Sequence, residues 1–292
     1  MDWDLAQLRA FAATIDEGSL DAAATALHVT PSAVSQRLKA LERAVGAVLL
    51  QRSRPVRPTP PGMEVLRLAR QLDALTRDAE HGLGVAESWP TVRIAVNADS
   101  LATWVLPALA PIAEPIRLEL LREGEDHTAD LLRDGSAMAA ITTEQIPVQG
   151  CTVERLGTMR YQPMAAPAFA ARWFPDGLTS QALAVAPVVV FDPKDRMQHR
   201  VLQRHGVVGE PPVHHVPAST QYVESVRLGF GWGMVPDLQR SGWTTSDGVV
   251  LSSRDAEDVA LYWQQWSLRT PSLERVAAAV RAASAEILRR IG

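Results

Sequence analysis

One stretch of the sequence concentrates side chains that can contact a polyanion. Residues 28–60 carry six positive side chains and one negative one, a net charge of +5, whereas the rest of the chain sums to −9. On a helical wheel, the segment that begins at Pro31 gathers polar and cationic groups on one side: Ser32, Ser35, Gln36, Lys39 and Arg43. Short polar groups near a helix N-terminus can bond to base edges, and cations further along can contact phosphates. The pattern predicts a DNA-contacting helix, with a solvated charged face as the alternative.

The sequence before this segment predicts how the helix is positioned. Thr30 is a good N-cap, and Pro31 suits a first helical position because its missing N–H would have no partner there. The predicted helix runs to about residue 44, stops at Gly46, and turns an apolar stripe to the opposite side: Val34, Leu38, Leu41 and Val45.

Two shorter apolar patterns come first. One predicts a helix over 5–16, closed by Gly18, and the other a helix over 20–27 capped by Ser19. Only residues 28–30 separate the second helix from the third, and this tight joint predicts a helix-turn-helix. An amphipathic helix of an all-α domain would explain the periodicity but not the joint.

A proline-rich segment follows the predicted recognition helix. Residues 48–50 predict a short strand, and residues 51–60 hold too many prolines for a central strand. Arginines on an extended hairpin beside a recognition helix can bind phosphates or enter the minor groove, so we interpret the segment as a wing. A polyproline ligand for a partner domain is the alternative. The predicted DNA-contacting residues are Thr30, Pro31, Ser32, Ser35, Gln36, Lys39, Arg43, Arg52 and Arg54.

A helical pattern and a change in composition divide the chain. Apolar residues at 65, 68, 72, 75 and 79 form a heptad seam on a helix over about 63–81, which predicts a dimerisation helix, with docking onto its own second domain as the alternative. Glycines at 82 and 84 and the sequence SWP at 88–90 mark a boundary. We expect a DNA-binding domain over 1–62, a linker and dimerisation helix over 63–88, and a further domain over 89–292.

Residues 89–292 alternate strand and helix patterns, in an α/β class of fold. Strands are expected at 92–96, 117–121, 138–142, 188–191, 213–216 and 232–236, and helices from Ser100, over 128–133, near 195–204 and from Ser219. Strand-like segments 161–166 and 261–268 are the natural crossovers between two lobes. The first lobe would cover about 89–161 and 267–292, and the second about 162–266.

Polar side chains follow several of these strands. In open α/β sheets, ligands bind beyond the carboxyl ends of strands, where helix N-termini favour anions. Hydroxyls suit a carboxylate, and acidic groups suit an ammonium or guanidinium, so we expect an amino-acid site with room for a basic side chain. The predicted residues are Asn97, Asp99, Ser100, Thr142, Thr143, Glu144, Asp192 and Thr220. The alternatives are that Ser100 only caps a helix, Asp192 only caps a turn, and Glu144 is solvated.

Composition narrows the class of protein. The chain has 292 residues, of which 47% are hydrophobic and 21% charged, which fits a globular protein and excludes fibrous and disordered ones. No apolar run reaches the ~18 residues of a membrane helix, and the acidic start differs from a signal peptide, so a cytoplasmic protein is expected. The single cysteine, Cys151, is expected to be a small buried hydrophobe. No nucleophile elbow and no metal-ligand spacing occur, so we expect neither enzyme activity, nor a cofactor, nor a metal.

The N-terminal motifs resemble a known family. LRAF at 8–11, GSLDAAA at 18–24 and LHVTPSAVSQRLKALE at 27–42 are similar to the winged helix-turn-helix of LysR-type transcriptional regulators. The similarity extends along the chain. The wing, AVNADS at 95–100, AITTE at 140–144 and GWGMVP at 231–236 resemble the ArgP/LysG branch, which senses basic amino acids and controls their export.

This resemblance implies a fold and a set of partners. The fold would be an N-terminal winged helix-turn-helix, a long linker helix and a two-lobed effector domain like a periplasmic binding protein. The partners would be double-stranded operator DNA, RNA polymerase and other copies of the chain, as a dimer through the linker helix or a tetramer. The effector would be L-lysine or L-arginine. Histidine or another amino acid stays an alternative, since Asp195 and Arg196 lie near the proposed site.

Two rivals come from other classes of protein. An architectural or replication-associated DNA-binding protein without an inducer would have the same N-terminus but a second domain that binds nothing. A solute-binding or enzymatic domain on a DNA anchor would carry a signal peptide or a catalytic cluster.

Overall fold

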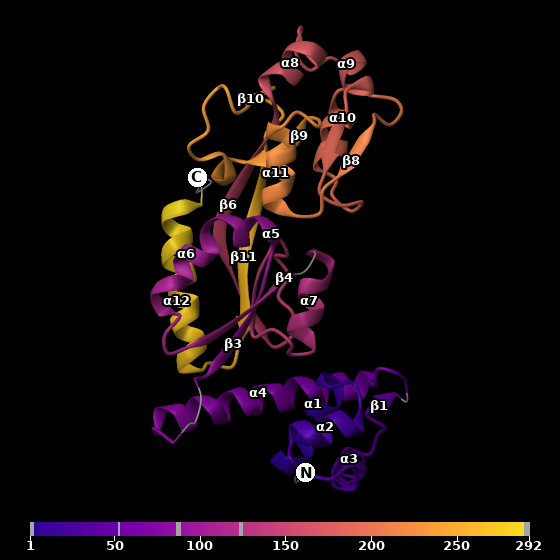
Figure 1. The fold of residues 1–292 in the computed structure, drawn as a ribbon. Coiled ribbons are helices and arrows are strands. Elements are labelled where there is room, and N and C mark those ends of the chain that lie inside the picture. Colours follow the sequence, from indigo (N-terminus) through magenta and orange to yellow (C-terminus); the bar gives the residue numbers. More distant parts are fainter. Residues whose placement is uncertain (1–2, 52, 86–88, 123–124, 289–292) are drawn as a thin grey trace.

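The computed structural model describes residues 3–51, 53–85, 89–122 and 125–288. A helical head that contains the N-terminus lies below an elongated α/β domain, and the long helix α4 runs between them (Figure 1). The described part of the chain contains no helix that is long and apolar enough to span a bilayer.

Three helices form the head, and each starts where the sequence places a cap. They are α1 (Leu5–Asp16), α2 (Leu20–Ala26) and α3 (Pro31–Val45). Their N-caps Asp4, Ser19 and Thr30 each accept a hydrogen bond from a backbone N–H of the first turn. Gly46 ends α3 in the left-handed region, at φ 77°. The head's core includes Leu8, Phe11, Val34, Leu38, Leu41 and Leu49.

The wing is a small hairpin. Strand β1 (Leu50–Gln51) pairs antiparallel with β2 (Arg57–Pro58). The strand predicted at 48–50 therefore lies further along the chain: Val48 is exposed, and the N–H of Leu49 donates to the Glu42 carboxylate of α3 (2.9 Å) rather than to a partner strand. This bond ties the residue before the wing to α3.

Helix α4 (Pro60–Gly82) begins three residues before the predicted start, because Thr59 caps it by accepting from the Gly62 N–H (3.1 Å). Only some residues of the predicted heptad seam remain available to a second copy of the chain, because the others pack against the head. Val65 is buried in the head's core and Leu72 packs against it, whereas Leu68 and Leu75 are half-buried on another face. The dimer seam is thus reduced to Leu68, Leu75 and Ala79, and dimerisation stays a prediction.

One curved sheet organises the second domain. Within the described residues it has seven strands, in the order β10-β6-β11-β5-β3-β4, with β9 paired to β6. The strands are β3 (Thr91–Val96), β4 (Arg117–Arg122), β5 (Ala139–Thr142), β6 (Cys151–Ala165), β9 (Gly233–Pro236), β10 (Val249–Val250) and β11 (Glu257–Trp266). Strands β3, β4 and β5 are parallel, while β11 runs antiparallel to residues 151–161 of β6.

The first lobe consists of β3, β4 and β5 with the helices around them. Its helices are α5 (Ala98–Ser100), a π-helical turn (Leu101–Val105), α6 (Leu106–Leu109), a 3₁₀ turn (Ala110–Ile112), α7 (Glu125–Arg133) and α12 (Pro271–Ile287). The helix predicted from Ser100 starts at Ala98, because Asn97 accepts from the Ser100 N–H (2.8 Å) and is the cap.

The second lobe surrounds β9 and a short parallel pair, β7 (Val188–Val190) and β8 (Val213–His215). Its helices are α8 (Pro167–Trp173), α9 (Ser180–Val185), α10 (Met197–Arg204), α11 (Ser219–Arg227) and a 3₁₀ turn (Asp237–Arg240). Sequence patterns predicted α10 and α11 but missed α8, α9 and β10. Strands β6 and β11 connect the lobes. They overlap the crossovers predicted at 161–166 and 261–268 but begin ten and four residues earlier.

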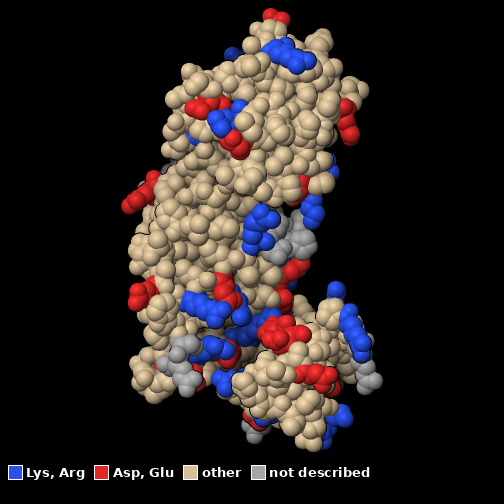
Figure 2. All heavy atoms as spheres, viewed as in Figure 1, with Lys and Arg blue, Asp and Glu red and all other residues tan. Residues whose placement is uncertain are grey.

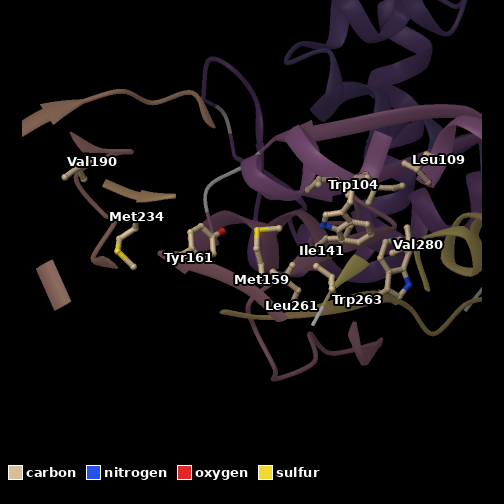
Figure 3. Packing of buried hydrophobic residues seen from close by; sticks show 14 of the residues in the cluster. Trp104, Leu109, Ile141, Met159, Tyr161, Val190, Met234, Leu261, Trp263 and Val280 are labelled. Atoms are coloured by element: carbon tan, nitrogen blue, oxygen red, sulfur yellow. The ribbon is translucent and has the colours of Figure 1, made fainter. Parts of the chain in front are cut away.

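The lobes share one apolar core. Figure 3 shows it extending from Leu109 and Val280, past Trp104 and Trp263, to Met159, Tyr161, Met234 and Val190. Tyr161 therefore lies where the first lobe meets the second. Cys151 is half-buried at the start of β6, and burial raises the pKa of its thiol to about 11.

Candidate DNA-binding face and effector cavity

Helix α3 presents the predicted DNA-contacting side chains on one face. Thr30, Pro31, Ser32, Gln36, Lys39 and Arg43 are exposed, and Ser35 is half-buried. Thr30 accepts from the Ala33 N–H (3.2 Å) and shares a hydrogen bond with Ser32 (3.0 Å), which orders the helix N-terminus. Arg43 donates from Nε to the Lys39 carbonyl (3.2 Å) and so lies along the helix. The arrangement suits entry of the N-terminal turns into a groove.

The wing follows α3 in the chain and is attached to the rest of the head. The Val56 N–H donates to the Gly18 carbonyl (3.0 Å), and Gly18, at φ 71°, packs against Pro55. Arg54 is exposed on the wing. Arg52, also predicted to contact DNA, lies outside the described residues. The DNA roles of all these side chains stay predictions.

A cavity of about 340 Å³ lies between the two lobes. The first lobe contributes Asn97, Ala98 and Asp99, and the crossover strands contribute Tyr161 and Val259. The second lobe supplies the remaining wall: Phe191, Asp192, Lys194, Asp195, Arg196, Met197, Arg200, Tyr222, Met234 and Pro236. A volume of this size can enclose a free amino acid.

Asp99 joins the two lobes through three hydrogen bonds. Tyr161 Oη donates to Oδ2 (2.7 Å), and Ser219 Oγ donates to Oδ1 (2.6 Å). Gln239 Nε2 also donates to Oδ1 (3.2 Å), and it donates to Ser219 Oγ as well. Burial raises the pKa of the Asp99 carboxyl above its ordinary value, opposed by the Ser219 and Tyr161 bonds and assisted by the negative charge of Asp195. A cation in the cavity would relieve this penalty.

Two more carboxylates come from the loop after β7. Asp192 Oδ1 accepts from the N–H groups of Lys194 (2.7 Å) and Asp195 (3.0 Å), so it caps a turn and also lines the cavity. Asp195 accepts from the Met197 N–H (3.0 Å) at the start of α10. Burial raises the pKa of the Tyr222 phenol, and the negative charges of Asp195 and Asp99 raise it further.

Cationic side chains occupy the same wall. Lys194, Arg196 and Arg200 line the cavity, and Arg200 donates from Nε to Glu257 Oε2 (2.9 Å) on β11. The cavity thus presents both signs of charge, as recognition of a zwitterion requires.

Several predicted effector residues lie elsewhere. Ser100 is buried next to Asp99, and its Oγ has no hydrogen-bond partner among the described residues. Thr142 is buried and accepts from the Glu144 N–H (3.1 Å), while Glu144 itself is exposed. Thr220 is exposed, and its neighbour Ser219 contacts Asp99 instead. Of the eight predicted residues, Asn97, Asp99 and Asp192 line the cavity, whereas Ser100, Thr142, Thr143, Glu144 and Thr220 do not.

Sequence reasoning missed Tyr161 and Gln239, which lie 62 and 140 residues from Asp99. No local signal marks such distant partners. A His, Cys, Asp and Glu cluster with the geometry of a metal site is not found in the part of the chain that the structure describes.

Comparisons with known proteins agree with this architecture. Residues 5–63 match the model of the bacterial regulatory helix-turn-helix protein, lysR family, and residues 87–285 match the LysR substrate binding domain. The lysine export transcriptional regulatory protein LysG of Corynebacterium glutamicum is 39% identical over 287 residues, which cover 97% of this chain and 98% of the relative.

Solved structures give the same result. The crystal structure of ArgP from Mycobacterium tuberculosis is 42% identical and superposes with a TM-score of 0.89, covering 98% of both chains. Full-length LysG from C. glutamicum with bound effector Arg is 38% identical, with a TM-score of 0.82 over 98% of this chain and 99% of that one. The chain therefore belongs to the LysR family of bacterial helix-turn-helix transcriptional regulators.

Proposed function

We propose that this regulator responds to a basic amino acid, arginine or lysine, bound in the cavity between the lobes. The observation that carries the proposal is the grouping of Asp99, Asp192 and Asp195 in one cavity with cationic side chains. The related LysG of C. glutamicum, whose structure holds Arg as its effector, supports the same ligand class.

The charges define an orientation for the ligand. We place its side-chain cation against Asp99, because that carboxylate is buried and its ionised form is penalised until a cation arrives. The ligand carboxylate then faces Lys194, Arg196 and the N-terminus of α10, where backbone N–H groups favour an anion. Amino acids without a cationic side chain would use only part of this set.

The rival reading, an architectural protein without an inducer, does not account for the buried carboxylate. Keeping Asp99 in the cavity disfavours the charged form, a cost that a DNA-binding role alone gives no reason to retain. A ligand that compensates the charge supplies the reason.

Thermal unfolding with each of the twenty amino acids tests the effector. A ligand that binds only the folded protein raises the free energy of unfolding by RT ln(1 + [L]/Kd), about 2.7 kcal/mol at a hundred-fold excess over Kd. The melting temperature rises with it. We expect an upward shift with arginine and lysine, a smaller one with histidine and none with glutamate. Equal shifts with neutral and basic amino acids would contradict the role of the carboxylates, and no shift with any of them would restore the architectural rival.

A second test separates DNA contact from ligand contact. Gln36→Ala should weaken binding of a DNA fragment selected by the wild-type protein from a random pool, by about 1–3 kcal/mol at one base pair. Lys39→Ala should weaken binding to all sequences and lower the slope of log affinity against log salt by about 1.

Gel-shift titrations at several salt concentrations measure both effects. Arg77→Ala is the control, because Arg77 lies on α4 and pairs with Asp73 of the same helix (2.7 Å). Loss of arginine binding in the Gln36 or Lys39 variants would contradict the separation of DNA-binding and effector domains.

We also propose how the chain is divided, how it assembles and what it regulates. We assign DNA binding to residues 1–62, the linker to 63–88 and effector binding to 89–292, and we expect a dimer through Leu68, Leu75 and Ala79 on the exposed side of α4. A pair of such dimers would form the tetramer. The protein would act on DNA in the cytoplasm, contact RNA polymerase, and control a gene for amino-acid export, as the name of the C. glutamicum relative states for that protein.

A further inference from the structure

Arg70 connects three parts of the molecule. Its guanidinium pairs with Asp16, the last residue of α1 in the head. Nη2 makes that pair. Nη1 donates to the Asp134 carbonyl and to Ser136 Oγ, both at 2.8 Å, in the turn between α7 and β5 of the first lobe. The Asp134 carboxylate lies 3.4 Å from the same nitrogen. The Arg70 side chain, itself on α4, is only 11% exposed, whereas its partners Asp16 and Asp134 are 43% and 25% exposed.

The contact surface around Arg70 is closely packed. Gly135 has φ 75°, and a Cβ there would lie 3.3 Å from the Arg67 Cα and 3.4 Å from the Arg70 Cδ. Arg67 Nη1 donates to the Gln149 carbonyl (2.9 Å) in a second turn of the first lobe. Further along α4, Asp78 accepts from Ser272 Oγ (2.5 Å) at the start of α12. Figure 2 shows acidic and basic side chains meeting where the head lies under the effector domain.

Helix α4 uses separate faces for its two partners. Arg67, Arg70, Ala74 and Asp78 follow one another at spacings of three and four, so they share the face turned to the first lobe. Val65, Leu66 and Ala69 are buried on another face, in the head's core. Arg70 lies at the border, and from there its guanidinium reaches Asp16 as well.

We infer that Arg70 couples the orientation of the DNA-binding head to the first lobe through the Asp16–Arg70–Asp134 bridge. The turn that it holds leads into β5, which is paired in parallel with β3, and β3 ends at the cavity residues Asn97 and Asp99. A displacement of the 134–137 turn therefore changes which partners the guanidinium keeps, and with them the position of α1. Arg70 is a positioning residue that touches neither ligand nor the predicted DNA face. The coupling part of the inference rests on the proposed response to a basic amino acid.

The test compares Arg70→Met with Arg77→Met in the full-length protein. Arg77 is a matched control because it lies on the same helix, is more exposed and pairs with Asp73 of that helix. The first measurement is the ratio of DNA affinities with and without saturating arginine, on a fragment selected by the wild-type protein. Allosteric ratios are typically about 5- to 150-fold. We expect Arg70→Met to bring the ratio within about two-fold of 1, with its affinity for arginine unchanged, and Arg70→Lys to restore part of it.

The second measurement needs no effector. Hydrogen–deuterium exchange of the 134–137 turn, which Arg70 contacts, should quicken about three-fold or more in Arg70→Met and stay unchanged in Arg77→Met. An arginine-dependent ratio in Arg70→Met equal to that of the wild type overturns the coupling. If wild-type protein does not respond to arginine, the proposed function fails and exchange alone decides on the bridge, which unchanged exchange in Arg70→Met would overturn.

Discussion

Asp99→Asn should abolish most of the affinity for arginine while leaving the fold intact. The amide keeps the size of the carboxyl group and can still accept from Tyr161 or Ser219, but it carries no charge to pair with a cation. Removing one partner of a desolvated charge pair costs about 2–5 kcal/mol. Calorimetric titration should therefore give an arginine Kd about 30-fold or more above that of the wild type.

Two controls isolate the charge. Citrulline replaces the guanidinium of arginine with a neutral ureido group, so its affinity should change far less than that of arginine in the variant. Glu144→Gln removes an exposed carboxylate that does not line the cavity, so the arginine Kd of this variant should stay within about two-fold of the wild-type value. If Glu144→Gln weakened arginine binding as much as Asp99→Asn, the cavity would be the wrong site. The prediction that arginine binds at the strand end near Glu144 would then be the better one.

Without ligand, Asp99→Asn should be more stable than the wild type. Burial raises the pKa of Asp99 in the folded protein above its ordinary value of 3.8, so the folded protein holds a proton more tightly than the unfolded chain. The stability that this proton contributes is fully present below 3.8 and is lost as the pH rises through the raised pKa. Above the raised pKa the ionised group therefore destabilises the free protein, and asparagine removes that cost.

The pH dependence of binding has the opposite sign. Only ionised Asp99 attracts a cation, so the arginine affinity of the wild type should rise as the pH rises through the raised pKa, with a flatter profile in Asp99→Asn. Melting curves and titrations between about pH 4 and 8 measure both effects. A variant that melts lower than the wild type and keeps its arginine affinity would show that Asp99 only fastens the lobes together.

Local features of the chain are the ones that the sequence predicted well. Thr30, Pro31 and Gly46 act within one or two turns of helix, so their residue types alone locate the ends of α3. The error at Ser100 is of the same local kind, since Asn97 three residues earlier competes for the same cap and accepts from the Ser100 N–H.

The cavity depends on longer-range geometry. The prediction of Thr142 and Glu144 assumed that every strand end faces the ligand. In the structure, the Gln264 side chain of β11 donates to the Glu144 carbonyl (2.9 Å), which holds that loop beside β11. Ser219 and Gln239 reach Asp99 only because β6 and β11 bring the second lobe against the first, and no periodicity in the sequence encodes this meeting.

The linker shows how one pattern can serve two partners. Val65, Leu68, Leu72 and Leu75 fit a heptad, yet the head's core takes Val65 and Leu72. A single-chain pattern cannot tell a seam for a second copy from a seam for a neighbouring domain, because both bury the same apolar side chains.

Gly62→Ala should strongly destabilise the head and weaken DNA binding, although alanine is the better helix former. Gly62 lies in the first turn of α4, where an added Cβ would overlap the backbone carbonyl oxygen of Leu49 and lie 3.2 Å from the Pro58 Cβ. Pro58 belongs to the wing and Leu49 directly precedes it, so either the wing or the helix must move. Overpacking typically costs about 1–3 kcal/mol, and a clash with backbone places this variant at about 3 kcal/mol or more.

Gly82→Ala gives the matched control on the same helix. A Cβ at Gly82 meets no atom within 4 Å, so this substitution should leave the free energy of unfolding unchanged or raise it by up to about 1 kcal/mol. Denaturant unfolding followed by circular dichroism measures stability, and gel-shift titration should show DNA affinity lowered about ten-fold or more for Gly62→Ala alone. Equal stability of the two variants would mean that α4 does not begin against the carbonyl of Leu49. The wing would then not be held in place by the linker helix, and displacements of α4 could not reach the DNA through it.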